Sequence, residues 1–368
     1  MLNRRVCSGP LPAAHRLVSA TALSVLMLGI GTTAQAQDSQ LPPVSIGAGV
    51  RTSFAHTEFD DDTVDSTDRF LLDSARIYIN GSVTKSIKFM FNTEYTGASN
   101  EVGILDAAAR FEVSNAFNVW AGRFLPPSDR ANLYGPYYAH HWGVFSDGVQ
   151  DGYPFIFQGR ADGVMYWGQF DKLKVSAGLF DGPSLAVGGA GDNVLGAARI
   201  QFDFWDPEAG YYLNGTYYGE KNILAVGLAG QMQGEDNTAW SADFLLERKV
   251  GMGGAYTVEA EWARYHKLGG YPNPAGTPYD TNDGGYVLGA YLFPAMSGPG
   301  RFEVLGKYAH ARFRGPFPEE TQKTSEVNLN YLLKQFNARL MIFFQDFRYD
   351  VADSANFWKL GAGLQLQM

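Results

Sequence analysis

Residues 122–168 read GRFLPPSDRANLYGPYYAHHWGVFSDGVQDGYPFIFQGRADGVMYWG. Two segments with the apolar alternation of β-strands, 117–124 and 161–170, flank the middle of this stretch. The 36 residues between them, 125–160, show neither strand nor helix periodicity. So long an irregular segment is uncommon in a compact domain unless it has a function. We therefore expect the strands to form a cylinder and residues 125–160 to be a loop that folds into it.

The rest of the chain repeats the alternation of apolar and polar residues over short segments. In 239–248, for example, Trp240 and Phe244 alternate with Ser241 and Asp243. No apolar run of helix-spanning length occurs outside the N-terminus, and the alternation is typical of transmembrane β-barrels. The sequence predicts an all-β fold, an antiparallel transmembrane barrel of about 16 strands, with these ranges: 44–55, 70–83, 87–96, 102–113, 117–124, 161–170, 173–181, 194–204, 222–233, 239–248, 253–265, 284–293, 301–312, 322–332, 336–347 and 357–368.

The links between these segments are long and short in turn. Those after odd-numbered strands are mostly long, whereas those at 84–86, 114–116 and 171–172 are tight. Outer-membrane barrels have long outer loops and short periplasmic turns, so the short links are expected on the periplasmic side. The link 205–221 is an exception. It follows an even-numbered strand, where a short turn is expected, but it is long. Tyr and Trp near strand ends favour a membrane barrel over the alternative, a soluble β-sandwich.

The N-terminus has the features of an export signal. Basic residues at Arg4 and Arg5 precede a short apolar core, and an Ala-x-Ala site ends at Ala36. We predict a cleaved signal peptide over 1–36 and a porin-like barrel domain over 37–368 that is exported through the periplasm to the bacterial outer membrane. The only cysteine, Cys7, lies in the predicted signal, so no disulfide is expected in the barrel.

Composition argues against several other functions. The formal net charge is −9, which disfavours nucleic acid as a partner. The sequence has none of the common hydrolase, zinc-protease or phosphate-loop motifs, and no cofactor is expected. Weak candidates for metal ligands are the pair His140–His141 and the acidic stretches 60–62 and 280–284. A solvated loop explains each of them more simply, so no metal is predicted.

Charged residues expected to face the lumen are the main candidates for function. Strand alternation and loop position give ten of them, which we expect to line the pore and its constriction: Arg76, Arg110, Arg123, Asp129, Arg130, Arg160, Arg199, Asp243, Glu259 and Glu261. The basic members on strands come mainly from the first half of the barrel, and the acidic ones from the second half. Facing rows of opposite charge would create a transverse field across the constriction.

Several strings in this order resemble the porin O/P family of bacterial outer-membrane channels. They are GRFLPP (122–127), GRADGVMYWG (159–168), GLFDG (178–182), AR (198–199), ADFLLE (242–247), EAE (259–261) and GYVLGAYL (285–292). The resemblance covers most of 44–368 and implies a sixteen-stranded, trimeric barrel with the loop after the fifth strand in the lumen. Two departures are a loop without Lys, where phosphate-selective members are basic, and a C-terminal Met368 in place of Phe.

The sequence therefore predicts a non-enzymatic, water-filled channel for passive diffusion of small hydrophilic solutes or ions, phosphate and other anions among them. The expected partners are outer-membrane lipid and lipopolysaccharide, small polar solutes or inorganic ions, and two further copies of the chain. Two alternatives stay open. One is an outer-membrane barrel enzyme, and the other is a non-conducting scaffold for a periplasmic or surface partner.

Overall fold

The computed structural model describes residues 43–96, 100–149, 159–182, 194–268, 279–315, 318–350 and 356–368. The predicted signal peptide lies outside these residues, as do the last part of the long loop, 150–158, and the Gly-rich link 183–193. No helix in the described ranges is both long and apolar enough to cross a membrane.

Sixteen antiparallel strands close into a barrel, which confirms the predicted fold class and strand count. The strands are β1 (Val44–Phe59), β2 (Thr67–Ser82), β3 (Ile87–Thr96), β4 (Glu101–Ser114), β5 (Phe117–Phe124), β6 (Ala161–Phe170), β7 (Leu173–Asp181), β8 (Val194–Asp203), β9 (Ile223–Gln233), β10 (Asn237–Val250), β11 (Gly254–His266), β12 (Thr281–Ser297), β13 (Gly300–Arg314), β14 (Glu320–Lys334), β15 (Ala338–Tyr349) and β16 (Phe357–Gln367). Within the described ranges, three short helical segments join them: α1 (Arg130–Tyr134), η1 (Pro136–Tyr138) and η4 (Gly251–Gly253).

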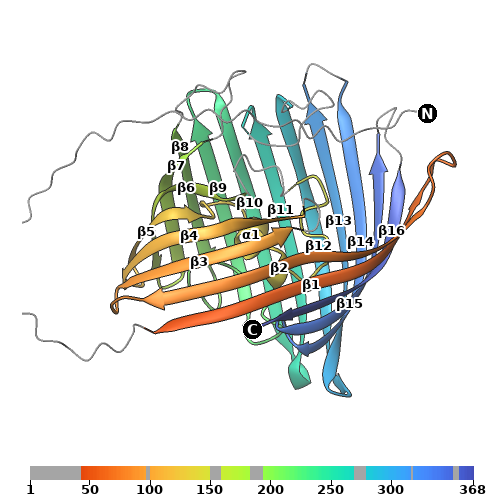
Figure 1. The fold of residues 1–368 in the computed structure, drawn as a ribbon, viewed down its shortest axis with the longest axis horizontal. Helices are drawn as coiled ribbons and strands as arrows, with labels where there is room; N and C mark the ends of the chain where they lie inside the picture. Colours follow the sequence, from red (N-terminus) through yellow and green to blue (C-terminus); the bar gives the residue numbers. More distant parts are fainter. Residues whose placement is uncertain are drawn as a thin grey trace, which may run out of the picture. The chain divides into compact units, whose positions relative to one another are not determined.

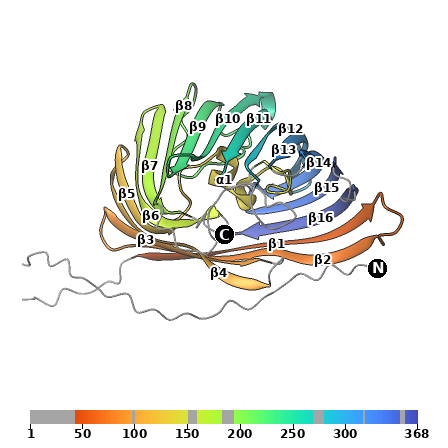
Figure 2. The same ribbon diagram turned by 90° about the horizontal axis from the view of Figure 1, so that it is seen from above.

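Each strand pairs with its neighbours in sequence, and β1 pairs with β16 to complete the ring (Figure 1). Beyond the last paired strand residue, the backbone N–H of Met368 donates to the Ala48 carbonyl at 2.9 Å. Closure matters because an open strand edge in hydrocarbon would leave backbone groups without hydrogen bonds. Seen from above, the strands form a wall around α1 (Figure 2).

The outer face of the barrel is apolar and the interior is mixed. Exposed residues such as Ile77, Val287 and Ile342 alternate with buried polar ones along the strands. The interior also holds a hydrophobic cluster that joins the wall to the segments folded inside it. Its larger members include Trp120, Phe124, Leu133, Met165, Tyr211 and Leu213.

The anomalous link between β8 and β9 also folds inward, although it leaves the barrel at the end that carries the short turns. The backbone N–H of Gly215 donates to the Tyr138 carbonyl at 2.9 Å, and that of Leu213 donates to the Leu133 carbonyl at 3.3 Å. Residues 204–222 therefore meet the long loop inside the barrel, which explains why this link is longer than a turn.

Candidate functional site

The long loop enters the barrel directly after β5 and forms α1 and η1 there. Asp129 caps α1, accepting hydrogen bonds from the Asn132 backbone N–H at 2.8 Å and from its Nδ2 at 2.7 Å. Gly135, at φ +61°, ends the helix in a conformation that favours glycine. The loop was predicted to fold into the lumen, and its described part, 125–149, does so.

Acidic side chains of the second half of the barrel hold this loop in place. Glu259 accepts hydrogen bonds from the hydroxyl groups of Tyr134 at 2.8 Å and Tyr286 at 2.6 Å. Further along the loop, His140 Nδ1 lies 3.3 Å from Glu303 Oε1. Glu259 therefore anchors the loop and does not face an open path.

Two buried arginines pair with Glu208 and Asp243 in this region. Arg130 Nη1 donates to Glu208 Oε1 at 2.9 Å, and both side chains have no exposed area. Arg199 Nη2 donates to Asp243 Oδ1 at 2.8 Å, and Asp243 also lies 3.7 Å from Arg130. Burial disfavours ionisation of Glu208, but the guanidinium of Arg130 outweighs it and holds the pKa of this carboxyl below its usual value.

Burial also disturbs the ionisation of Asp129, the residue that caps α1. Burial, with a smaller contribution from the nearby charge of Asp243, raises the pKa of Asp129 to about 6. The hydrogen bonds from Asn132 act in the opposite direction. A carboxyl group with this pKa is half-ionised near pH 6 and mostly ionised at neutral pH.

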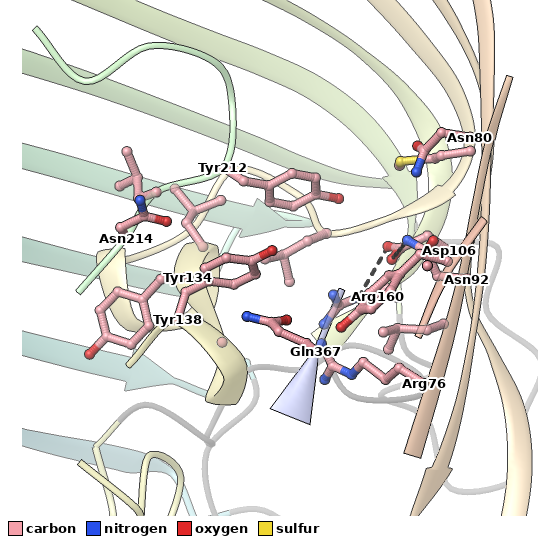
Figure 3. Close-up of a pocket in the computed structure, with 18 of the residues that line it drawn as sticks. Arg76, Asn80, Asn92, Asp106, Tyr134, Tyr138, Arg160, Tyr212, Asn214 and Gln367 are labelled. Carbon is pink, nitrogen blue, oxygen red and sulfur yellow. Dashed lines mark hydrogen bonds and ion pairs between the residues drawn. The ribbon is translucent and has the colours of Figure 1, made fainter. Parts of the chain in front are cut away.

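A cavity of about 600 Å³ remains between the loop and the wall of β1–β4. It runs from the end of the barrel that carries Gln367 and Met368 to Arg160 (Figure 3). Its polar side chains include Arg76, Arg110, Arg160, Asp106, Asn80, Asn92, Asn132, Asn214 and the hydroxyl groups of Tyr134, Tyr138 and Tyr212. Three guanidinium groups line the cavity together with one side-chain carboxylate, that of Asp106; the carboxylates that pair with Arg76 and Arg110, those of Glu94 and Glu112, do not line it.

The three arginines of the cavity are fixed by contacts at its wall. Arg160 Nε donates to Asp106 Oδ1 at 3.2 Å, while Arg76 pairs with the buried Glu94. The guanidinium carbon of Arg110 lies 5.4 Å from the centre of the Trp120 ring. The side chains keep 8% (Arg76), 18% (Arg110) and 13% (Arg160) of their surface exposed, so all three remain accessible to a solute.

These positions revise the expected arrangement of charge. Arg76, Arg110 and Arg160 come together at the cavity, whereas Arg199, Asp243, Glu259 and Glu261 face inward but do not line it. Asp129 and Arg130 are also fully buried. The acidic arc is covered by the loop it binds, so the expected transverse field does not cross the cavity.

Arg123 does not face the lumen as expected. It shares a strand face with Val119 and Ala121, while Trp120 and Phe124 point into the interior. Its Nε donates to Asp162 Oδ1 at 2.7 Å on the outside of the barrel. The physical reason is that the interior beside this end of β5 is filled with aromatic side chains, so Trp120 and Phe124 take the inward positions next to Arg123.

Sequence reasoning missed the two partners that fix the loop most firmly. Glu208 lies in the anomalous link, and only the unusual length of that link pointed to it. Arg339, on β15, is fully buried; its Nη2 donates to Gln365 Oε1 at 2.8 Å, and its Nη1 donates to the Ala139 carbonyl of the loop. The sequence signal that could have identified Arg339 was its inward-facing position in the alternating pattern of β15.

The metal candidates do not form a site. In the described ranges, no group of three or more His, Cys, Asp or Glu side chains is placed to hold a metal ion. His141 Nε2 lies 3.1 Å from Lys307 Nζ. Asp283 lies within β12 rather than in a loop, and it pairs with Arg312 at 2.6 Å.

No protein-family model matches the sequence, and no curated protein does. Solved structures match the fold. The anion-selective porin of Comamonas acidovorans is 15% identical, with a TM-score of 0.58 over 89% of this chain and 100% of that one. OprB of Pseudomonas putida is 10% identical, with a TM-score of 0.60 over 88% and 94%. The trimer form of OmpT, an outer-membrane protein of Vibrio cholerae, is 14% identical, with a TM-score of 0.54 over 89% and 99%.

The fold is that of the outer-membrane porins. This supports the general part of the resemblance seen in the sequence, but it does not single out the phosphate-selective O/P type.

Proposed function

We propose that the protein is a porin of the bacterial outer membrane, through which small hydrophilic anions diffuse passively. The observation that carries this proposal is the cavity wall, where the side chains of Arg76, Arg110 and Arg160 are accessible while the lining contributes one side-chain carboxylate, that of Asp106. A positively charged passage concentrates anions and repels cations, and close side chains let that field act on each ion that passes. The anion selectivity named for the Comamonas porin, a protein of the same fold, is consistent with this.

The acidic residues then have a structural role. Glu259 and Asp243 bind the loop, Asp243 is paired with Arg199 and Arg130, and Arg130 binds the link between β8 and β9. The solute class follows from the basic wall alone. Inorganic anions, phosphate included, and small organic anions fit this description, whereas the porin O/P resemblance by itself does not choose among them.

We also propose the assembly and processing that the sequence suggested. The chain is made with a signal peptide over 1–36, matures as the barrel 37–368 and forms a homotrimer, as the trimer form of OmpT does. N-terminal sequencing of protein taken from outer membranes should begin at Gln37. Cross-linking in membranes should give a three-subunit species.

Recording from planar lipid bilayers tests the channel itself. Purified trimers should give discrete, stable conductance steps, grouped in threes. A folded protein that inserts and stays silent would support the alternative, a scaffold whose lumen is filled by the loop and the inward link. Catalysis is not proposed for any residue of the described interior.

A further inference from the structure

The cavity beside the long loop has two faces of different chemistry (Figure 3). The side chains of Arg76 and Arg160 lie on one side, against the wall formed by β2 and β4. The opposite side comes from the long loop and from the link between β8 and β9. We call it the neutral face, because its side chains are uncharged at neutral pH: Tyr134, Tyr138, Tyr212 and Asn214.

The link between β8 and β9 contributes half of the neutral face and is fixed by contacts with the long loop. The Tyr211 hydroxyl donates to the Leu125 carbonyl at 2.8 Å, and Arg130 Nη1 donates to the Asn214 carbonyl at 3.1 Å. The Tyr212 ring packs on the Tyr211 ring, with 5.2 Å between the ring centres. A segment that enters from the short-turn end of the barrel therefore holds Tyr212 and Asn214 beside the cavity.

These two side chains have hydrogen-bonding groups that no described residue uses. The side-chain amide of Asn214 is half-buried and makes no hydrogen bond within the described ranges. The Tyr212 hydroxyl, which points towards the arginine side in Figure 3, likewise has no partner in that part of the chain. An unpaired polar group costs free energy when it is buried, and a polar group of a solute beside it would recover that cost. The amide can donate and accept, as can the hydroxyl, so both can bind the hydroxyl groups of a solute.

We propose that the passage favours small organic anions that carry hydroxyl groups, and that Asn214 and Tyr212 of the link determine this specificity. The anionic group lies against the guanidinium groups, and the hydroxyl groups lie against the neutral face. An inorganic anion is too small to contact both faces at once. The cavity volume of about 600 Å³ is in the usual range of small-molecule sites. This inference rests on the proposed function, because it needs an open passage that prefers anions.

Block of the chloride current by three potassium salts, recorded in planar bilayers, tests the inference. Gluconate and hexanoate are carboxylates with the same number of carbon atoms, but only gluconate carries hydroxyl groups. Phosphate is the inorganic reference. Gluconate should halve the wild-type current at a concentration about three-fold or more below that of hexanoate or phosphate, because one net hydrogen bond changes affinity by roughly two- to ten-fold.

The variant Asn214→Leu/Tyr212→Phe removes both hydrogen-bonding groups and keeps the approximate size of the two side chains. The half-blocking concentration of gluconate, divided by that of phosphate, should rise about five-fold or more. The matched control is Asn115→Leu/Tyr308→Phe, which removes one amide from the exposed turn after β4 and one hydroxyl group from the outer face of β13. Its ratio should equal that of the wild type.

Tyr212→Phe alone deletes a hydroxyl group that has no partner in the described structure, so it should leave the link in place. A smaller rise of the ratio in this variant would show that the effect does not come from a displaced link. Equal block of the wild type by gluconate and hexanoate would overturn the inference, as would an unchanged ratio in the double variant. A silent or cation-preferring channel contradicts the proposed function itself, whereas an anion-preferring channel with equal block contradicts only this inference.

Discussion

Arg130 and Glu208 form a fully buried ion pair between two segments that enter the barrel from opposite ends. Arg130 belongs to the long loop after β5, and Glu208 to the link between β8 and β9. Arg130 also donates to the Asn214 carbonyl of that link at 3.1 Å, and Tyr217 donates to Glu208 at 2.8 Å. The pair therefore fixes the position of the loop beside the cavity.

Breaking this pair should release the loop. Glu208→Gln leaves the Arg130 charge buried without its counter-ion, which typically costs about 3–5 kcal/mol. We expect faster proteolysis within the loop and noisier channel currents, while the barrel remains closed. The double variant Arg130→Met/Glu208→Leu should be less affected than either single variant. If the loop of the Glu208→Gln variant resisted proteolysis as well as that of the wild type, the Arg130–Glu208 pair would not anchor the loop.

A second anchor is Trp142, whose ring stacks on Phe343 of β15 at 5.6 Å with an interplanar angle of 3°. The guanidinium group of Arg51, which lies on β1, is 4.1 Å from the centre of the Trp142 ring. Trp142→Ala removes both contacts, and truncating a buried aromatic side chain costs about 3 kcal/mol or more. Thermal unfolding should show the loss, and mean conductance should rise as the loop moves. Phe302→Ala, whose ring packs on Tyr331 on the outer face of the barrel, should leave conductance unchanged.

The raised pKa of Asp129 predicts a pH dependence. A carboxyl group whose pKa is higher in the folded loop than in the unfolded one stabilises the loop below about pH 4, and this contribution is lost as the pH rises through about 6. Protection factors of loop amides, which correct for the pH dependence of intrinsic exchange, should therefore be higher at pH 5 than at pH 7, with stability falling by about 1 kcal/mol in total between them. Asp129→Asn, which keeps an acceptor for the cap, should abolish this slope. An unchanged slope in this variant would show that Asp129 is not its source.

Arg123 should matter little to transport, because it lies on the outer face. Its ion pair with Asp162 is partly exposed, and such pairs contribute about 1 kcal/mol or less. Arg123→Gln should thus leave ion selectivity unchanged and lower the unfolding free energy only slightly. A large change in selectivity would place this side chain in the passage after all.

The barrel could be predicted from sequence because alternation is a local property that each strand carries by itself. The Trp240/Asp243 pattern in β10 is an example. The assignment of faces failed for Arg123 because the rule of polar residues inside assumes a wet lumen, whereas Trp120 and Phe124 pack against Tyr211 and Phe180 there. Contacts between distant segments, such as Arg130 with Glu208, leave no periodic trace. The charge pattern showed basic and acidic halves but not which half the loop would cover.

The central claim is that the basic cavity wall determines selectivity, and the reversal potential in an approximately ten-fold KCl gradient tests it most directly. The wild type should prefer chloride. Arg110→Gln/Arg160→Gln should lower the anion-to-cation permeability ratio by about three- to ten-fold, whereas Arg123→Gln should match the wild type. Arg76 is left intact so that Glu94 stays paired. A cation-preferring wild type, or a double variant with an unchanged reversal potential, would contradict the account.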